Sequence, residues 1–307
     1  MTTAPQPLII FVPGLLPKPE REVHREALLR CLLTGVKRID QYVAAAIELR
    51  PAAFDIVSWT YDFYGVRRDF EIDRAAVDEV VEKRQADERD IAEATSWTRR
   101  LTRWIYKLGD RAPFLIPHIA NEHMAVHLRD LNRYLNDENG IGAHTRRMLK
   151  APILAAAEDG CPVLLIAHSM GSVIAYDTLW ELSQGDYAGV KLDLLLTMGS
   201  PLGQHYMQKR LKGAEREGAA RYPSIIRRWL NLSAIGDLTA LDPYLATDFR
   251  EMMDLELLES IDDDLILTHF RLNGQLNVHA EYGYLVNEKT ARAVADWWRG
   301  HDPLAAT

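Results

Sequence analysis

The chain has 307 residues, of which 48% are hydrophobic and 26% charged, a composition typical of a globular protein with a large buried core. Its formal net charge of −8 argues against nucleic acid as a partner, because binding to phosphates requires a basic surface. The two cysteines, Cys31 and Cys161, form no C-x-x-C pattern, so we expect both to be reduced and buried, with no metal or redox role.

The amino-terminal sequence lacks the basic segment and long apolar run of a signal peptide. No apolar run approaches the length of a membrane span. We therefore expect a cytoplasmic protein.

Short apolar runs alternate with helical patterns along the chain. Strands are expected at residues 8–12, 54–59, 163–166, 192–197, 229–234 and 265–272. Helices are expected over residues 20–46 with a split near Thr34 and Gly35, over 141–158, directly after residue 169, and over 289–299. This alternation predicts a single α/β domain over residues 1–307, with a mostly parallel, doubly wound sheet covered on both faces.

Residues 66–137 differ from the rest of the chain. They are rich in charge, contain no strand candidate and predict a helical insert. One insert helix, over residues 91–108, carries apolar residues on one side and basic residues on another: Trp97, Leu101, Trp104, Ile105 and Leu108 against Arg100, Arg103 and Lys107. Packing of the apolar side on the rest of the protein is the favoured interpretation. Weak contact with a membrane interface, or a lid over a pocket, is the alternative.

The stretch PVLLIAHSMGSVIAYD at residues 162–177 combines an apolar strand, a tight turn and a helix. Ser169 falls in the turn, and the small residues Ala167 and Gly171 let the strand and the helix approach closely. This is the pattern of the nucleophile elbow, G-x-S-x-G, with Ala167 in place of the first glycine. Ser169 is therefore the candidate nucleophile.

A nucleophilic serine needs a base for its proton and an acid that orients the base. Asp237 follows the strand at 229–234, and His279 lies in the loop before the last helix. The two oxyanion donors are expected from the backbone amides of Met170, directly after the serine, and Leu15, after the first strand.

Several other residues compete for these roles. Asp242 is an alternative acid, although it lies farther from the strand end than Asp237. His269 lies within a strand pattern, His301 lies beyond the last helix, and His168 is expected to pack behind the nucleophile.

Five motifs together resemble the α/β-hydrolase superfamily, in particular its serine lipases and esterases. They are FVPGLL, AHSMGS, the Gly-Ser-Pro at 199–201, WLNLSAIGD and VHAEYGYL. The resemblance implies an α/β-hydrolase fold with a helical cap insert at 66–137, a Ser-Asp-His triad, and no metal or organic cofactor. The chain departs from the family at Pro13-Gly14, where His-Gly is common, and at Ala167; both are positions where shape matters most. Little chain precedes the first strand, so the first strands of larger relatives are expected to be missing.

The resemblance implies a serine hydrolase that cleaves a small-molecule or lipid carboxylic ester through an acyl-enzyme. Thioesterase, amidase or acyltransferase activity on the same triad is an alternative, as is a non-catalytic protein whose charged insert binds a partner. A dehalogenase is disfavoured because its chemistry would require a carboxylate at position 169. His123 and His127, with His118 nearby, have a metal-like spacing but lack the H-E-x-x-H glutamate, so we expect exposed polar residues there.

Overall fold

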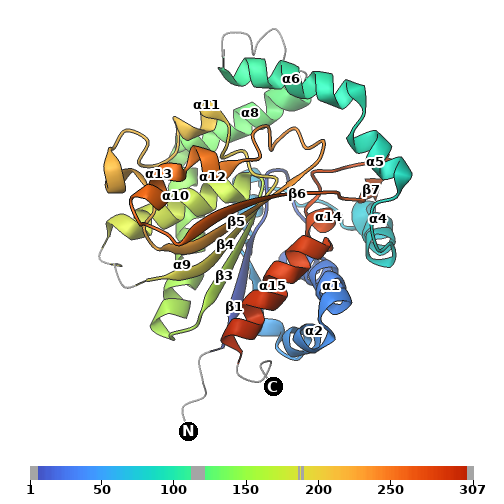
Figure 1. Ribbon diagram of the computed structural model, residues 1–307, viewed down its shortest axis with the longest axis horizontal. Coiled ribbons are helices and arrows are strands. Elements are labelled where there is room, and N and C mark those ends of the chain that lie inside the picture. The colour runs from blue at the N-terminus through green and yellow to red at the C-terminus, as the bar shows by residue number, and fades with distance from the viewer. Residues whose placement is uncertain (1–5, 112–121, 186, 188–189, 303–307) are drawn as a thin grey trace.

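The computed structural model describes residues 6–111, 122–185, 187 and 190–302. Side chains at positions 105, 108–109, 111 and 122–127 lie outside the description. The predicted α/β fold is confirmed: a six-stranded parallel sheet is covered by helices on both faces (Figure 1). In spatial order its strands are β2 (Phe54–Ile56), β1 (Leu8–Val12), β3 (Val163–His168), β4 (Leu192–Met198), β5 (Ile226–Ala234) and β6 (Ser260–Ile266). An antiparallel hairpin, β7 (Arg271–Leu272) and β8 (Gln275–Leu276), stands apart.

Alternate side chains of each buried strand supply two separate cores, because successive residues point to opposite faces of a sheet. In β1, Ile9 and Phe11 enter one core, and Ile10 and Val12 enter the other. The first core is covered by α1 (Arg21–Ile39), α2 (Gln41–Glu48), α4 (Glu71–Glu82), α14 (Glu281–Leu285) and α15 (Glu288–His301). The second is covered by α3 (Trp59–Tyr64), α8 (Glu122–Leu135), α9 (Ile141–Glu158), α10 (Met170–Gln184), α12 (Leu245–Asp248) and α13 (Arg250–Asp254).

The strand order reverses direction between β1 and β3. The chain leaves β1 toward β2 on one side, and the strands from β3 onward extend the sheet on the other side. In open parallel sheets such a switch point leaves a crevice at the carboxyl ends of the strands, where ligands usually bind. Ser169 follows β3 and the Gly14 loop follows β1, so both lie at this point.

Several predicted boundaries were wrong. The helix predicted over 91–108 is divided between α5 (Glu88–Ala94) and α6 (Trp97–Arg111), and the fifth strand begins at Ile226, earlier than the predicted 229. The first helix runs unbroken through Gly35 and ends at Ile39. The next residue, Asp40, starts α2, because its carboxylate accepts from the amides of Tyr42 and Val43. The second strand ends at Ile56, and Trp59 already begins α3. The sixth strand lies at 260–266, earlier than predicted, because its acidic edge-strand sequence SIDDDLI does not resemble a buried strand.

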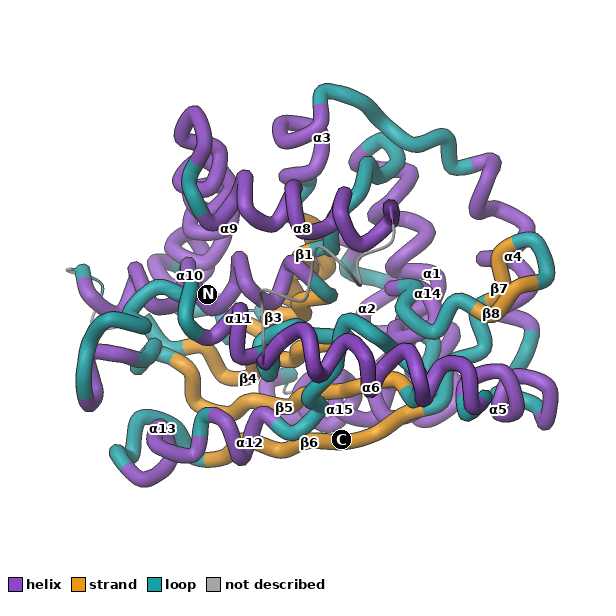
Figure 2. The backbone as a smooth tube through the Cα atoms, turned by 90° about the horizontal axis from the view of Figure 1, so that it is seen from above, coloured by secondary structure: helices purple, strands orange, loops and turns teal. Residues whose placement is uncertain are grey.

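Between β2 and β3 the described residues form helices and no strand. They include α5 (Glu88–Ala94) and α6 (Trp97–Arg111), and the 66–137 limits of the insert stay a prediction. Helices α5 and α6 form an arm across the carboxyl-end side of the sheet, near the short helix α11 (His205–Gln208) (Figures 1 and 2). In the part of the chain that is described, no helix is both long and apolar enough to cross a membrane.

The favoured packing of the α6 apolar side was wrong for the side chains that are described. Trp97, Leu101 and Trp104 are 73%, 47% and 60% exposed. Arg99 and Arg103 face the protein instead and donate to backbone carbonyls of the loops beneath them. Those loop carbonyls need hydrogen-bond donors, which the apolar side of the helix cannot provide.

Candidate active site

Ser169 occupies a strained turn between β3 and α10. Its φ of 54° and ψ of −124° are unusual for a residue with a side chain, and its amide donates to the Met198 carbonyl at 2.8 Å. The following helix passes so close to β1 that a Cβ on Gly171 would lie 2.2 Å from the Val12 carbonyl oxygen. A small residue at 171 is therefore required, as the sequence predicted.

The structure brings Ser169, His279 and Asp237 together in one hydrogen-bonded chain. His279 Nε2 lies 2.9 Å from Ser169 Oγ, and His279 Nδ1 lies 2.8 Å from Asp237 Oδ2. Asp237 is fully buried, whereas about a third of the His279 side chain is exposed. A base that contacts both the hydroxyl and a buried carboxylate can accept the serine proton while its ring stays oriented.

The competing residues lie elsewhere. Asp242 accepts from the Tyr244 amide at 3.3 Å, whereas the imidazole of His279 contacts Asp237. His269 is buried, with Nε2 near the Val80 and Lys83 carbonyls, and His301 Nδ1 lies 2.8 Å from the Trp297 carbonyl.

Asp237 is held by more than the imidazole. The hydroxyl of Tyr284, on α14, donates to its Oδ2 at 2.8 Å, and the Thr239 amide donates to its Oδ1 at 2.8 Å. Burial by itself would raise the pKa of Asp237, but His279, Tyr284 and Thr239 outweigh it and hold the pKa below its ordinary value. Sequence reasoning missed Tyr284, although it stands in the same VHAEYGYL motif as His279.

The loop after β1 lies directly against the serine. A Cβ on Gly14 would lie 2.8 Å from Ser169 Cβ, so only glycine fits there. The loop is fixed on both sides of Leu15, because the Trp59 indole donates to the Pro13 carbonyl at 2.9 Å and the Leu16 amide donates to Tyr64 Oη at 3.1 Å.

Leu15 thus lies in a braced loop beside the hydroxyl. Met170 opens α10, where the first amides have no carbonyl partner within the helix. The two amides predicted as oxyanion donors therefore come from segments that border Ser169.

A buried ionic cluster lies behind the serine–histidine–aspartate chain. Glu281 Oε1 accepts from Lys18 Nζ at 3.0 Å and contacts His24 Nε2 at 2.8 Å. Burial by itself would raise the pKa of Glu281, but Lys18 and His24 outweigh it and hold the pKa far below its ordinary value. Lys18 follows the loop after β1 and Glu281 follows His279, so their ion pair ties two segments of the site. Sequence reasoning missed this pair, which joins residues far apart in the chain.

His168 packs behind the nucleophile, as expected. Burial lowers its pKa to about 3, so the ring is neutral near neutral pH. Its Nε2 lies 2.8 Å from the His279 carbonyl, which requires the N–H to be on Nε2, and its Nδ1 faces Glu281 Oε2 at 3.6 Å. His168 therefore supports the backbone of the histidine that contacts Ser169.

The arm of the insert holds the two loops that carry Asp237 and His279. Arg99 donates to the Leu276 carbonyl at 2.9 Å and to the Gly236 carbonyl at 3.4 Å. Arg103 donates to the carbonyls that follow Asp237, those of Ala240 and Leu241, at 3.1 and 3.0 Å.

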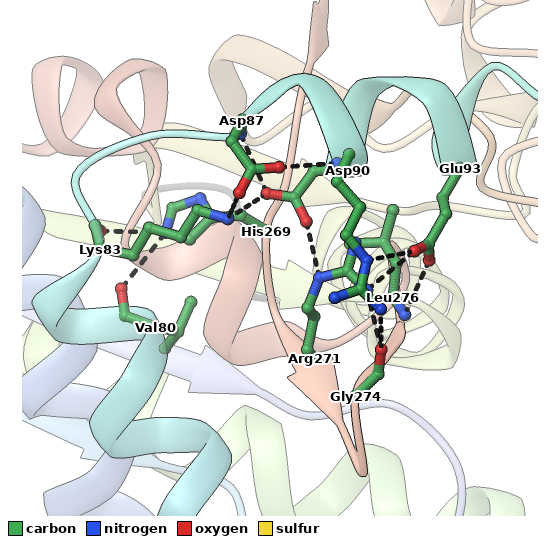
Figure 3. Close-up of polar contacts among 10 residues, drawn as sticks. Val80, Lys83, Asp87, Asp90, Glu93, His269, Arg271, Gly274 and Leu276 are labelled. Atoms are coloured by element: carbon green, nitrogen blue, oxygen red, sulfur yellow. Dashed lines mark hydrogen bonds and ion pairs between the residues drawn. The ribbon is translucent and has the colours of Figure 1, made fainter.

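An ion network anchors the β7–β8 hairpin, which leads into His279, to helix α5. Arg271 donates to Asp90 at 2.8 Å and to Glu93 at 2.9 Å, and Lys83 pairs with the same Asp90 (Figure 3). Asp90 is fully buried; burial by itself would raise its pKa, but Lys83 and Arg271 hold the pKa below its ordinary value. The arm and the histidine loop are thus joined as one unit.

The three histidines with metal-like spacing lie partly outside the described residues. His118 is not described, and only the backbone is described at His123 and His127. Among the described residues, no group of three or more His, Cys, Asp or Glu side chains could hold a metal ion. Cys31 is buried, as expected, but Cys161 is partly exposed.

The chain matches no protein-family model, no curated protein and no solved structure. The assignment of an α/β fold therefore rests on the observed sheet and helices, and any functional assignment rests on the geometry of the site.

Proposed function

We propose that the protein is a serine hydrolase that cleaves a carboxylic ester through an acyl-enzyme, on an α/β-hydrolase fold capped by the helices of the 66–137 insert. The observation that carries the proposal is the hydrogen-bonded chain from Ser169 Oγ through His279 to the buried Asp237. The strained backbone at Ser169 supports it, because such strain at a strand-to-helix turn is typical of a nucleophile elbow.

The reaction follows from the positions of these groups. Ser169 Oγ attacks the ester carbonyl carbon while its proton passes to His279 Nε2. The oxygen that becomes negative accepts hydrogen bonds from the amides of Leu15 and Met170. His279 then gives the proton to the leaving alcohol, and the acyl group stays on Ser169.

Water completes the cycle. It attacks the acyl carbonyl carbon and passes a proton to His279 Nε2, which returns it to Ser169 Oγ as the carboxylic acid leaves. Asp237 stays ionised throughout, since its pKa is held low, and it stabilises the imidazolium that forms in each half-reaction.

A fluorophosphonate probe and a series of p-nitrophenyl esters test the proposal. We expect the probe to label Ser169, and Ser169→Ala to lower ester turnover at least about a thousandfold while the protein stays folded. Asp237→Asn should lower turnover at least about a hundredfold, whereas the matched Asp242→Asn should not. Folded protein that is not labelled at Ser169 would refute the proposal, and parallel thioester and amide substrates would define the bond that is cleaved.

A further inference from the structure

The outward side of α6 carries a row of exposed apolar side chains. Trp97, Leu101 and Trp104 are spaced four and three residues apart, so they lie on one side of the helix, and all three are about half exposed or more. Exposed apolar side chains that gather on one surface usually mark an interaction site.

The inward side of the same helix is hydrogen-bonded to the rest of the protein. Arg99 and Arg103 make four hydrogen bonds to loop carbonyls, and the Asp110 carboxylate accepts from the amides of His205 and Tyr206 at 2.9 Å each. Rotating the helix to bury its tryptophans would break these bonds. The apolar row is therefore held outward.

The charge beside this row is positive. Arg100 and Lys107 are exposed on the flank of the tryptophan row, and the only acidic residue in the α6 sequence, Asp110, is bound to α11. This basic, apolar surface belongs to a chain whose net charge is −8. The complementary partner is consequently an anionic surface with an apolar layer beneath it.

An anionic phospholipid bilayer is such a partner, because its charged headgroups cover an apolar interior. Tryptophan is enriched at the headgroup level of membranes, and helices with tryptophan and leucine on one side and lysine or arginine beside them lie in the interface plane. Figure 1 shows α6 at the end of the molecule farthest from both termini, and Figure 2 shows it crossing the carboxyl-end side of the sheet. Ser169 belongs to the same side, because it directly follows β3.

We propose that the outward side of α6 docks the protein on anionic phospholipid membranes. The indoles of Trp97 and Trp104 enter the headgroup layer, and Arg100 and Lys107 contact lipid phosphates. A membrane is favoured over a protein groove because the surface is a single row of side chains flanked by basic groups. The inference does not depend on the proposed hydrolase activity.

Co-sedimentation of the full chain with lipid vesicles tests the proposal. We expect binding to vesicles of phosphatidylcholine mixed with phosphatidylglycerol, weaker binding to phosphatidylcholine alone, and weakening by added salt. The double variant Trp97→Ser/Trp104→Ser should bind at least about tenfold more weakly. Arg100→Ala/Lys107→Ala should lose about 25-fold, roughly fivefold for each basic side chain.

The control is Tyr42→Ser, which removes an aromatic ring that is 74% exposed on the distant helix α2 and should leave binding unchanged. Thermal unfolding of each variant shows that it is folded. Equal binding to both kinds of vesicle, or full binding by the folded double tryptophan variant, would overturn the proposal. So would tryptophan-dependent dimerisation without vesicle binding, since a second copy of the chain would then cover this surface.

Discussion

Helices α6 and α15 both combine tryptophans with basic residues, but the tryptophans face solvent in α6 and the core in α15. Each carries two tryptophans, with four arginines in α6 and two in α15, yet Trp297 and Trp298 of α15 are buried while Trp97 and Trp104 of α6 are exposed. The difference lies in what each helix covers. Helix α15 packs on the apolar surface of α1, whereas α6 lies over loops that present backbone carbonyls. The periodicity of a helix thus defines its two sides, and the surface beneath decides which side faces inward.

The largest effect is expected when the buried indole of α15 is removed. Trp298→Ala should lower the free energy of unfolding by about 3–5 kcal/mol, because it leaves a cavity and removes the hydrogen bond from Nε1 to Asp302 at 3.1 Å. The matched change Trp97→Ala in α6 should alter it by less than about 0.5 kcal/mol. Urea denaturation measures both values. Similar losses in the two helices would show that the α6 tryptophan is buried in solution.

A second prediction concerns the ionic cluster of Lys18, His24 and Glu281. This cluster ties the histidine loop to α1 and to the loop after β1, just as Arg99 and Arg271 tie it to the arm. Glu281→Gln should lower the free energy of unfolding by about 2–3 kcal/mol at neutral pH, because Lys18 and His24 lose a buried anionic partner. The pKa of Glu281 is lower in the folded protein than the value of about 4.3 expected when unfolded. The ionised carboxylate therefore stabilises the fold fully above that value, and this stabilisation is lost as the pH falls below it.

The difference between wild type and Glu281→Gln should consequently narrow as the pH falls through about 4, since glutamine has no proton to gain. Urea denaturation at a series of pH values follows the change. A difference that stays constant from neutral to acidic pH would mean that the carboxylate charge contributes nothing. Glu251→Gln, on α13, is a control outside the cluster.

The parallel sheet explains why Ser169 and Asp237 could be predicted to lie together: in such a sheet all strands end at the same edge, and the two residues follow β3 and β5. His279 was predicted from its place in the loop before the last helix, and it follows the β7–β8 hairpin, not a strand of the parallel sheet. Strand β6 was misplaced because its exposed acidic residues hide the alternation that marks a half-buried strand. The orientation of α6 could not be predicted, since it depends on backbone carbonyls in the loop after β5 and in β8.

The residues that support the candidate site could not be predicted from the sequence, for a different reason. Lys18, His24 and Glu281 belong to no periodic pattern, and Glu281 lies more than 250 positions from both partners. A buried charge pair of that kind becomes visible only when the fold has placed its members. Tyr284 lies in a motif that the sequence analysis recognised. The sequence alone could not show that its hydroxyl donates to Asp237.

The smallest effect is expected for Arg99, and it tests whether the arm positions the site. If the proposed hydrolase activity holds, Arg99→Ala should lower kcat for a soluble ester about tenfold with little change in KM, because the Gly236 and Leu276 carbonyls lose their shared donor and the loops beside Asp237 and His279 shift. A tenfold loss corresponds to about 1.4 kcal/mol of transition-state stabilisation.

Arg99→Lys should recover part of the rate, since lysine keeps the charge but can donate to one carbonyl more easily than to both. Arg100→Ala, on the exposed side of the same helix, should leave kcat unchanged. Equal rates for Arg99→Ala and Arg100→Ala in a protein labelled at Ser169 would show that α6 covers the site without positioning it.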